Sequence, residues 1–124
     1  MLNMENLYLN EYRKRNVTSG WLARNKFYHS RIYSTKDSEA WEYRFPCYHY
    51  GDTVTLMGSI VVYEDGFVKL NCYDAGFGGR SLYAPFYCAQ DWDNNHEVLE
   101  VVTKRFNNEL KRLGIKLKKE WHNE

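Results

Sequence analysis

The clearest alternation of apolar and polar positions lies in residues 53–74, and it predicts a β-hairpin. Apolar side chains occupy even-numbered positions on both sides of a polar turn: Val54, Leu56, Ile60 and Val62 before it, and Val68, Leu70 and Cys72 after it. Residues that face each other in an antiparallel pair lie on the same side of the sheet. A three-residue loop, 64–66, brings Val62 opposite Val68, whereas a two-residue turn would pair Val62 with Lys69. We therefore predict the longer loop, with its glycine in the left-handed conformation that such loops favour.

Three other segments have the composition of extended chain. Residues 26–33 ("KFYHSRIY") and 41–50 ("WEYRFPCYHY") are rich in aromatic and β-branched residues and predict strands. Pro46 cannot donate a hydrogen bond to a strand ladder, which predicts an edge position or a bulge there. Residues 81–89 ("SLYAPFYCA") predict a further strand, with Pro85 marking a sheet edge.

One long amphipathic helix is predicted for residues 95–113. Its apolar stripe recurs at spacings of three and four: Leu99, Val102, Phe106, Leu110 and Leu113. Asn94 is a suitable N-cap, and Glu97 three residues later completes a capping-box arrangement. Gly114 supplies a C-terminal stop. A shorter helix is predicted at the N-terminus, within residues 1–20.

Together these elements predict a single α+β domain over residues 1–124. Its sheet is an antiparallel meander of about four or five strands within residues 26–90, and the long C-terminal helix packs on one face. Ile115 and Leu117 suggest a short additional strand before a charged tail, residues 118–124. A doubly wound α/β fold is disfavoured, because strands and helices do not alternate along the chain.

The composition is that of a globular protein of the cytoplasm. Apolar residues make up 44% and charged residues 27% of the 124 positions, and a chain of this length can bury a core without disulfide bonds. No apolar run approaches the roughly 18 residues of a membrane helix. The three cysteines, Cys47, Cys72 and Cys88, lack close pairing, which favours a reducing compartment.

A glycine-rich run, Gly76 to Gly79, raises the question of nucleotide binding. A phosphate-binding loop of either common type leads directly into a helix, whose N-terminus faces the phosphate. Here the sequence "RSLYAP" follows, which is extended and carries a proline. The run therefore favours a hairpin loop. The alternative is a partner-binding loop in which Arg80 contacts a carboxylate or a phosphate.

The cysteines and histidines give little support to a metal site or a catalytic site. Cys47 and His49 lie two apart on a predicted strand and would share a face, and Cys72 and Cys88 could join them in a zinc site. The paired short spacings of structural zinc sites are absent, and Cys72 falls on the apolar hairpin face, where a thiol serves as a small hydrophobe. Nothing in the local sequence pairs a nucleophile with a base. We expect no metal, no cofactor and no catalytic residue.

The net charge of +1 hides a basic–acidic–basic pattern. Residues 1–36 and 101–124 have net charges of +5 and +4, and residues 37–100 have −8. Many of the acids fall in predicted turns, which are polar in any fold. If those turns share one end of the sheet, they form an acidic rim suited to a partner with a basic surface. The residues predicted to bind such a partner are Asp37, Glu39, Glu42, Glu64, Asp65, Tyr63, Phe67, Tyr73, Arg80, Tyr83 and Tyr87.

The basic clusters provide an alternative. Basic residues gather near tyrosines and a tryptophan at both ends of the chain, and bases of single-stranded nucleic acid stack on aromatic side chains. The residues predicted to contact nucleic acid are Arg13, Lys14, Arg15, Lys116, Lys118 and Lys119. A small enzyme of unknown type is a third hypothesis.

The segment "LYAPFY" and a closing helix that ends "NNELKRLGIKLKK" follow a sheet rich in tyrosine. In this combination residues 54–119 resemble small orphan accessory proteins of phages and mobile elements of Gram-positive bacteria. Some such proteins inhibit host defence systems by binding an effector, as anti-CRISPR proteins do. The resemblance implies a non-enzymatic inhibitor that acts by direct contact with a host protein.

Overall fold

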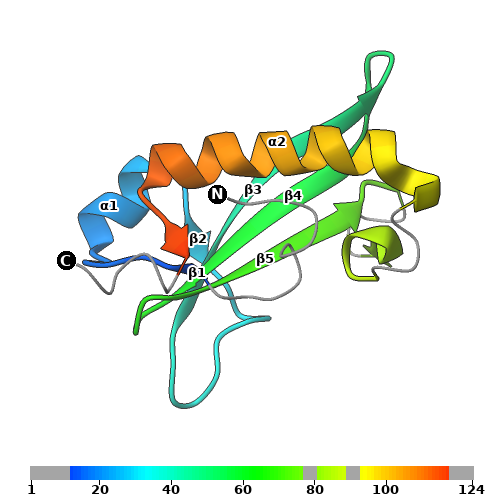
Figure 1. Cartoon of the computed structure of the whole chain (residues 1–124). Coiled ribbons are helices and arrows are strands. Elements are labelled where there is room, and N and C mark those ends of the chain that lie inside the picture. The colour runs from blue at the N-terminus through cyan, green and yellow to red at the C-terminus, as the bar shows by residue number, and fades with distance from the viewer. Residues whose placement is uncertain (1–11, 77–80, 89–92, 118–124) are drawn as a thin grey trace.

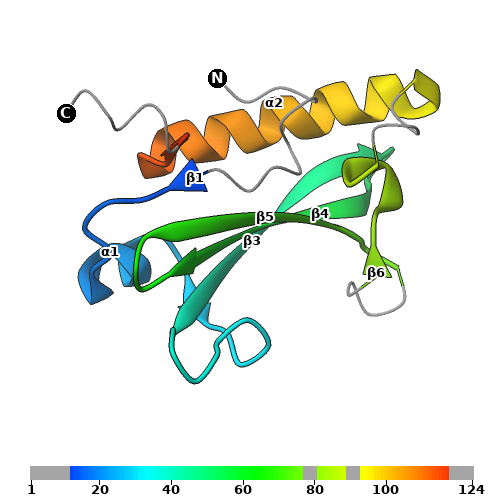
Figure 2. The same ribbon diagram turned by 60° about the horizontal axis from the view of Figure 1, so that its bottom comes forward.

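The computed structural model describes residues 12–76, 81–88 and 93–117, which form an antiparallel sheet with one long helix across it (Figure 1). The strands are β1 (Tyr12–Arg13), β2 (Tyr28–His29), β3 (Ala40–Tyr50), β4 (Thr53–Tyr63), β5 (Phe67–Asp74), β6 (Ser81–Leu82) and β7 (Lys116–Leu117). The helices are α1 (Ser19–Arg24), η3 (Ala84–Phe86), η5 (Asp93–Asn95) and α2 (His96–Leu113). The strand order is β2-β3-β4-β5-β1-β7, with β6 also paired to β5. The predicted α+β class is confirmed, and α2 lies along one face of the sheet (Figure 2).

The predicted register of the central hairpin is confirmed. In β4 and β5, Val62 pairs with Val68 and Gly58 pairs with Cys72. The loop between them has three residues, and Gly66 has φ +92°, as the turn geometry requires. A Cβ at Gly66 would lie 2.6 Å from the carbonyl oxygen of Lys14, so this position requires glycine for its surroundings as well as for its backbone angle.

The predicted strand 41–50 is confirmed as β3, whereas the predicted strand 26–33 is much shorter than expected. The segment 26–33 contributes only β2, which pairs with the beginning of β3. The remaining length of β3 therefore has no partner on its outer side among the described strands. Pro46 lies on this edge, and the register shifts between Pro46 and Tyr48 and again between Tyr48 and His49. The predicted bulge is confirmed, and it allows β3 to carry a proline.

The predicted strand 81–89 is confirmed only for Ser81–Leu82 and is wrong for residues 83–88; residue 89 lies outside the described part. After β6 the chain enters the 3₁₀ turn η3, with Pro85 in its first positions. Proline suits the start of a helical turn, because its fixed φ is already helical and its missing N–H would have no partner there. The turn places Phe86 in the core with no exposed surface. The segment that was predicted as an edge strand therefore forms a short 3₁₀ turn, and this turn buries the ring of Phe86.

The long helix has the predicted buried face, and its N-terminus differs in detail. All five residues of the apolar stripe are buried: Leu99, Val102, Phe106, Leu110 and Leu113. Gly114 ends the helix in the left-handed conformation, with φ 71°. At the other end η5 precedes the helix, so Asn95 rather than Asn94 takes the cap position, and its side chain makes no capping hydrogen bond. The predicted capping box is therefore not formed.

One buried acid also fixes the C-terminal half of α2. Glu109 has only 8% of its side chain exposed and accepts from two arginines of the same helix. Its carboxylate lies 2.9 Å from Arg105 Nη1 and 2.7 Å from Arg112 Nη2. Arg105 also donates to the carbonyl of Pro46, and Arg112 to the side chain of Asn25. This charged cluster links α2 to β3 and to the end of α1.

The N-terminal part of the chain does not match the predicted helix where it is described. Residues 1–11 lie outside the described part, but Tyr12 and Arg13 form a strand between β5 and β7. Tyr12 is 2% exposed and belongs to the core. The helix of this region is α1 instead, capped by the Thr18 side chain, which accepts from the Trp21 N–H. The predicted strand near Ile115 is confirmed as β7.

A series of aromatic rings in contact connects the sheet to the helices α1 and α2. Successive ring centroids lie 4.9–5.6 Å apart through Trp21, Phe27, Tyr43, Phe45, Phe106, Phe86 and Tyr87. Tilted and edge-to-face rings at such distances add to the stabilisation from burial. Much of the aromatic content of this chain is therefore core.

Candidate functional site

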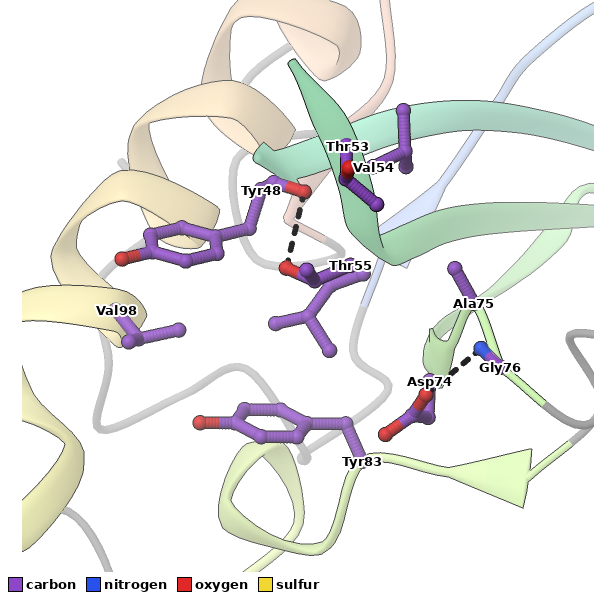
Figure 3. A pocket seen from close by; sticks show the side chains of 10 residues that line it. Tyr48, Thr53, Val54, Thr55, Asp74, Ala75, Gly76, Tyr83 and Val98 are labelled. Carbon is purple, nitrogen blue, oxygen red and sulfur yellow. Dashed lines mark hydrogen bonds between the residues drawn. The ribbon is translucent and has the colours of Figure 1, made fainter. Parts of the chain in front are cut away.

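A pocket of about 530 Å³ opens at the end of the sheet where β5 stops. The last β5 residue, Asp74, pairs with Leu56, whereas β4 begins three residues earlier at Thr53. The hairpin β3–β4 therefore extends beyond β5, and the space beside it is closed by the first turn of α2 and by Tyr83 (Figure 3). The lining residues are Tyr48, Thr53, Val54, Thr55, Leu56, Asp74, Ala75, Gly76, Tyr83 and Val98.

The polar groups of the pocket lie at different ends of it. The phenol oxygens of Tyr48 and Tyr83 point toward α2, where Val98 lies, and Asp74 lies on the opposite side (Figure 3). The Asp74 carboxylate accepts the Gly76 N–H at 2.8 Å. The Tyr83 hydroxyl donates to the Asn95 side chain at 3.3 Å. Burial, followed by electrostatic interaction with the neighbouring Cys72 and Tyr48 side chains, raises the pKa of Tyr83, so this phenol is neutral at physiological pH.

The predicted acidic turns lie together at the other end of the sheet. The β2–β3 connection and the β4–β5 turn are neighbours there (Figure 2), and the Glu64 N–H donates to the Glu39 carbonyl at 3.0 Å. Asp37, Glu39, Glu64 and Asp65 are all exposed; we call these four residues the acidic rim.

Basic side chains are interspersed among these acids. His29 pairs with Glu39, and the Arg13 guanidinium donates to the Asp65 carbonyl at 3.0 Å. Arg31 and Lys36 are exposed in the same β2–β3 connection. The surface around the acidic rim therefore carries both acidic and basic side chains and is not uniformly negative.

Three of the predicted contact residues have their polar side-chain atoms bonded within the fold and do not belong to this surface. Glu42 is 1% exposed; it accepts from Ser59 Oγ at 2.5 Å and from the Tyr28 hydroxyl at 3.0 Å. Tyr73 is also buried, with its hydroxyl bonded to that of Tyr33. The Tyr87 hydroxyl accepts the Cys72 N–H at 2.9 Å. These three side chains support the fold by satisfying buried polar groups.

The remaining predicted contact residues that the structure describes lie at opposite ends of the sheet. Phe67 is 39% exposed, and its ring lies 5.7 Å from that of half-buried Tyr63, next to the acidic rim. Tyr83 lines the pocket at the other end of the sheet. Arg80 lies outside the described residues.

The two basic clusters predicted to bind nucleic acid are brought together by the sheet. Arg13 pairs with Lys116 across β1 and β7, and with Phe67 across β1 and β5. Their neighbours Tyr12, Val68 and Leu117 are buried in the core, so by alternation this row faces away from α2. The ammonium group of Lys14 already contacts an aromatic ring of the protein, because its Nζ lies 4.8 Å from the centroid of a Trp21 ring. Arg15 is exposed, and Lys118 and Lys119 lie outside the described residues.

Two of the three cysteines, Cys47 and Cys72, form a buried thiol pair. Cys47 Sγ lies 3.9 Å from Cys72 Sγ, and both side chains are buried. They come from β3 and β5, the two neighbours of β4, which are about 10 Å apart at ~4.8 Å per strand, too far for a disulfide without backbone movement. The hydrogen bond with Cys47 and burial raise the pKa of the Cys72 thiol, which disfavours a nucleophilic thiolate.

The bulge in β3 explains why the histidine does not join these thiols. The two register shifts break the alternation, so Cys47 is buried while His49 is exposed. Cys88 is half-buried. Within residues 12–76, 81–88 and 93–117, no group of three or more potential ligand side chains is placed to hold a metal ion.

Comparisons with protein-family models, with curated proteins and with solved structures find no match to this chain. In the part of the chain that the structure describes, no helix has both the length and the apolar character needed to cross a bilayer.

The pocket is the feature that the sequence did not indicate. Its walls come from β3, β4, the end of β5, the segment before η3 and the start of α2. The one available signal was the unequal length of the paired strands, since the alternation in β4 begins before β5 can cover it.

Proposed function

We propose that this protein is a non-enzymatic binding protein whose acidic rim docks on a basic surface of a protein partner. The resemblance to accessory proteins of mobile elements supplies the class of partner, a host defence effector such as a CRISPR-Cas nuclease. Such effectors carry basic grooves for nucleic acid, and the proposal places the encounter in the cytoplasm.

The observation that carries the proposal is the contact between two turns that are far apart in the sequence. The Glu64–Glu39 hydrogen bond of 3.0 Å holds the β4–β5 turn against the β2–β3 connection, and this gathers four exposed carboxylates. Phe67 beside them offers an exposed ring. Interfaces commonly combine an aromatic side chain, which supplies affinity, with charged side chains, which supply orientation and association rate.

The test reverses the charge of the acidic rim. We expect the variant D37K/E39K/E64K/D65K to lose capture of a host protein from nuclease-treated bacterial lysate, and to lose protection of phage in cells with an active CRISPR-Cas system. Thermal unfolding followed by circular dichroism must show that the variant is folded.

The matched control is D52K/D93K/E97K/E100K, which makes the same change in net charge at exposed positions outside the acidic rim. We expect it to retain capture and protection. Equal activity of the acidic-rim variant and wild type would exclude docking through this surface. Equal loss in both variants would show that only net charge matters.

The pairing of Arg13 with Lys116 favours a second candidate function, binding of single-stranded nucleic acid. Two cationic side chains next to each other on one face of the sheet can contact successive phosphates of a nucleic-acid backbone. Phe67 in the same row offers a ring for stacking.

This candidate is tested with a fluorescein-labelled poly(dT) oligonucleotide and fluorescence anisotropy. We expect binding that weakens steeply with added salt, because phosphate contacts release counterions. The variant R13E/K116E should bind more weakly than K104E/K111E, which changes two exposed lysines on the outer side of α2. Recovery of nucleic acid alone from untreated lysate would favour this candidate over the first.

A further inference from the structure

The pocket at the end of the sheet is independent of both proposed surfaces. It lies at the C-terminal end of β5, whereas the acidic rim lies at the turn before β5 begins. Its volume of about 530 Å³ falls within the range of small-ligand sites. Its lining combines apolar side chains and tyrosine rings with a small number of polar groups, which is the usual character of such sites.

Among the described lining residues, the charged group of the pocket is an acid. Among the ten described lining residues Asp74 is the single acidic side chain, and none is basic. One Asp74 oxygen accepts the Gly76 N–H. A carboxylate has about four acceptor positions, so Asp74 can accept further donors. The other polar side chains among these described residues are hydroxyls of threonine and tyrosine, so the carboxylate is the charged group that a ligand meets on the described walls.

The apolar part of the pocket begins beside this carboxylate and runs toward α2. The rings of Tyr48 and Tyr83 both extend from the sheet side toward Val98, while Asp74 stays at the far end (Figure 3). A ligand that fills this space therefore meets the carboxylate at one end, and aromatic and aliphatic side chains along its length. The π faces of tyrosine rings also attract cations and the polarised CH groups next to them.

We propose that this pocket binds an alkylammonium group, with the cationic nitrogen at Asp74 and the aliphatic stem between Tyr48 and Tyr83, directed toward Val98. The same chemistry is offered by a free aliphatic amine and by a lysine side chain of a protein. The choice of probes below distinguishes these two sources.

The experiment is a titration of the full chain followed by amide chemical shifts in NMR. Pentylammonium is the cationic probe, with 1-pentanol and pentanoate as neutral and anionic probes of equal chain length. We expect pentylammonium to shift the amides of Thr55, Ala75, Gly76 and Val98 saturably, and to bind more tightly than either other probe. N-acetyl-lysine methylamide tests the protein source, and tighter binding than pentylammonium assigns the pocket to a lysine side chain.

The decisive variant is Asp74→Asn, which removes the charge and keeps an oxygen that accepts the Gly76 N–H. We expect it to bind pentylammonium about fivefold more weakly, the effect of one partly exposed ion pair. Asp52→Asn, in the exposed β3–β4 turn, makes the same change in charge outside the lining and should bind like wild type. Pentanoate binding as tight as that of pentylammonium, or equal affinity of D74N and wild type, would overturn the proposal.

Discussion

Gly58 provides the sharpest test of how this core is packed. It is buried in the middle of β4, between Phe45 of β3 and Cys72 of β5. A Cβ added there would lie 2.5 Å from Phe45 Cζ, 2.6 Å from Phe45 Cε2 and 3.1 Å from Phe106 Cζ. Carbon atoms in contact prefer about 3.5–4.0 Å. In Gly58→Ala the Phe45 ring must therefore move by about 1 Å.

The surroundings of Phe45 resist that movement. Its ring stacks on Tyr43 with centroids 5.5 Å apart and meets Phe106 edge-on at 5.0 Å. Overpacking of a core of this kind costs about 1–3 kcal/mol. Replacing glycine within a strand returns about 0.5–1 kcal/mol, because the unfolded chain loses conformational freedom. The midpoints of these two ranges give a net loss of about 1 kcal/mol in the free energy of unfolding for Gly58→Ala.

The assay is urea unfolding followed by tryptophan fluorescence and by circular dichroism. Gly20→Ala is the matched control, because Gly20 lies in α1 and a Cβ there meets no atom within 4 Å. It should gain about 0.5–1 kcal/mol. The double variant F45L/G58A should be more stable than the sum of its single changes indicates, since leucine lacks the ring atoms that clash. A G58A protein as stable as wild type would refute this account of the core.

Three further predictions use the same unfolding assay. Gly66→Ala should cost at least about 2 kcal/mol, because its φ is positive and its Cβ would approach the Lys14 carbonyl; Gly66→Asn should be no better, since the clash with the carbonyl remains. Tyr87→Phe should cost about 1–3 kcal/mol by leaving the Cys72 N–H without its acceptor. Burial also raises the pKa of Tyr87; the unfolded chain therefore releases this proton first, and wild-type stability should fall as pH rises above about 10, less steeply in Y87F. Glu109→Gln should cost about 1–2 kcal/mol, a value reduced by the solvent exposure of both arginines.

The parts of the fold that follow from local patterns could be predicted from the sequence. The register of β4 and β5 follows from the alternation on both sides of a short loop, because one wrong residue would turn a whole apolar face outward. The buried face of α2 follows in the same way from its spacing. Both depend only on residues that are close in the chain.

The parts that depend on distant partners could not be predicted. β1 is two residues long and exists because Val68 and Leu117 pair with Tyr12 from far along the chain. Glu42 looked like a surface acid, and its burial depends on Ser59 and a tyrosine of β2. No local pattern in the sequence indicates those contacts.

The same distinction between local patterns and distant contacts applies to the candidate sites. The acidic rim was predictable, because sequential hairpins place alternate turns at the same end of a meander. The pocket was not, because its shape depends on how far one strand extends past its neighbour and on which helix end covers the gap. Its aspartate and tyrosines are ordinary residues in the sequence, and they become a site only through that unequal pairing.

The separation of the two sites along the sheet makes their functions distinguishable. Asp74 lies at the last residue of β5, and the acidic rim lies around the turn before its first, so changes at the two ends share no partner and their effects on stability should add. If the pocket binds a lysine of the same partner that the acidic rim contacts, D74N and the acidic-rim variant should both weaken that complex. If it binds a free amine, D74N should leave capture unchanged while reducing pentylammonium binding. Weaker capture by D74N, with no weaker capture by D52N, would thus show that one partner spans the whole length of β5.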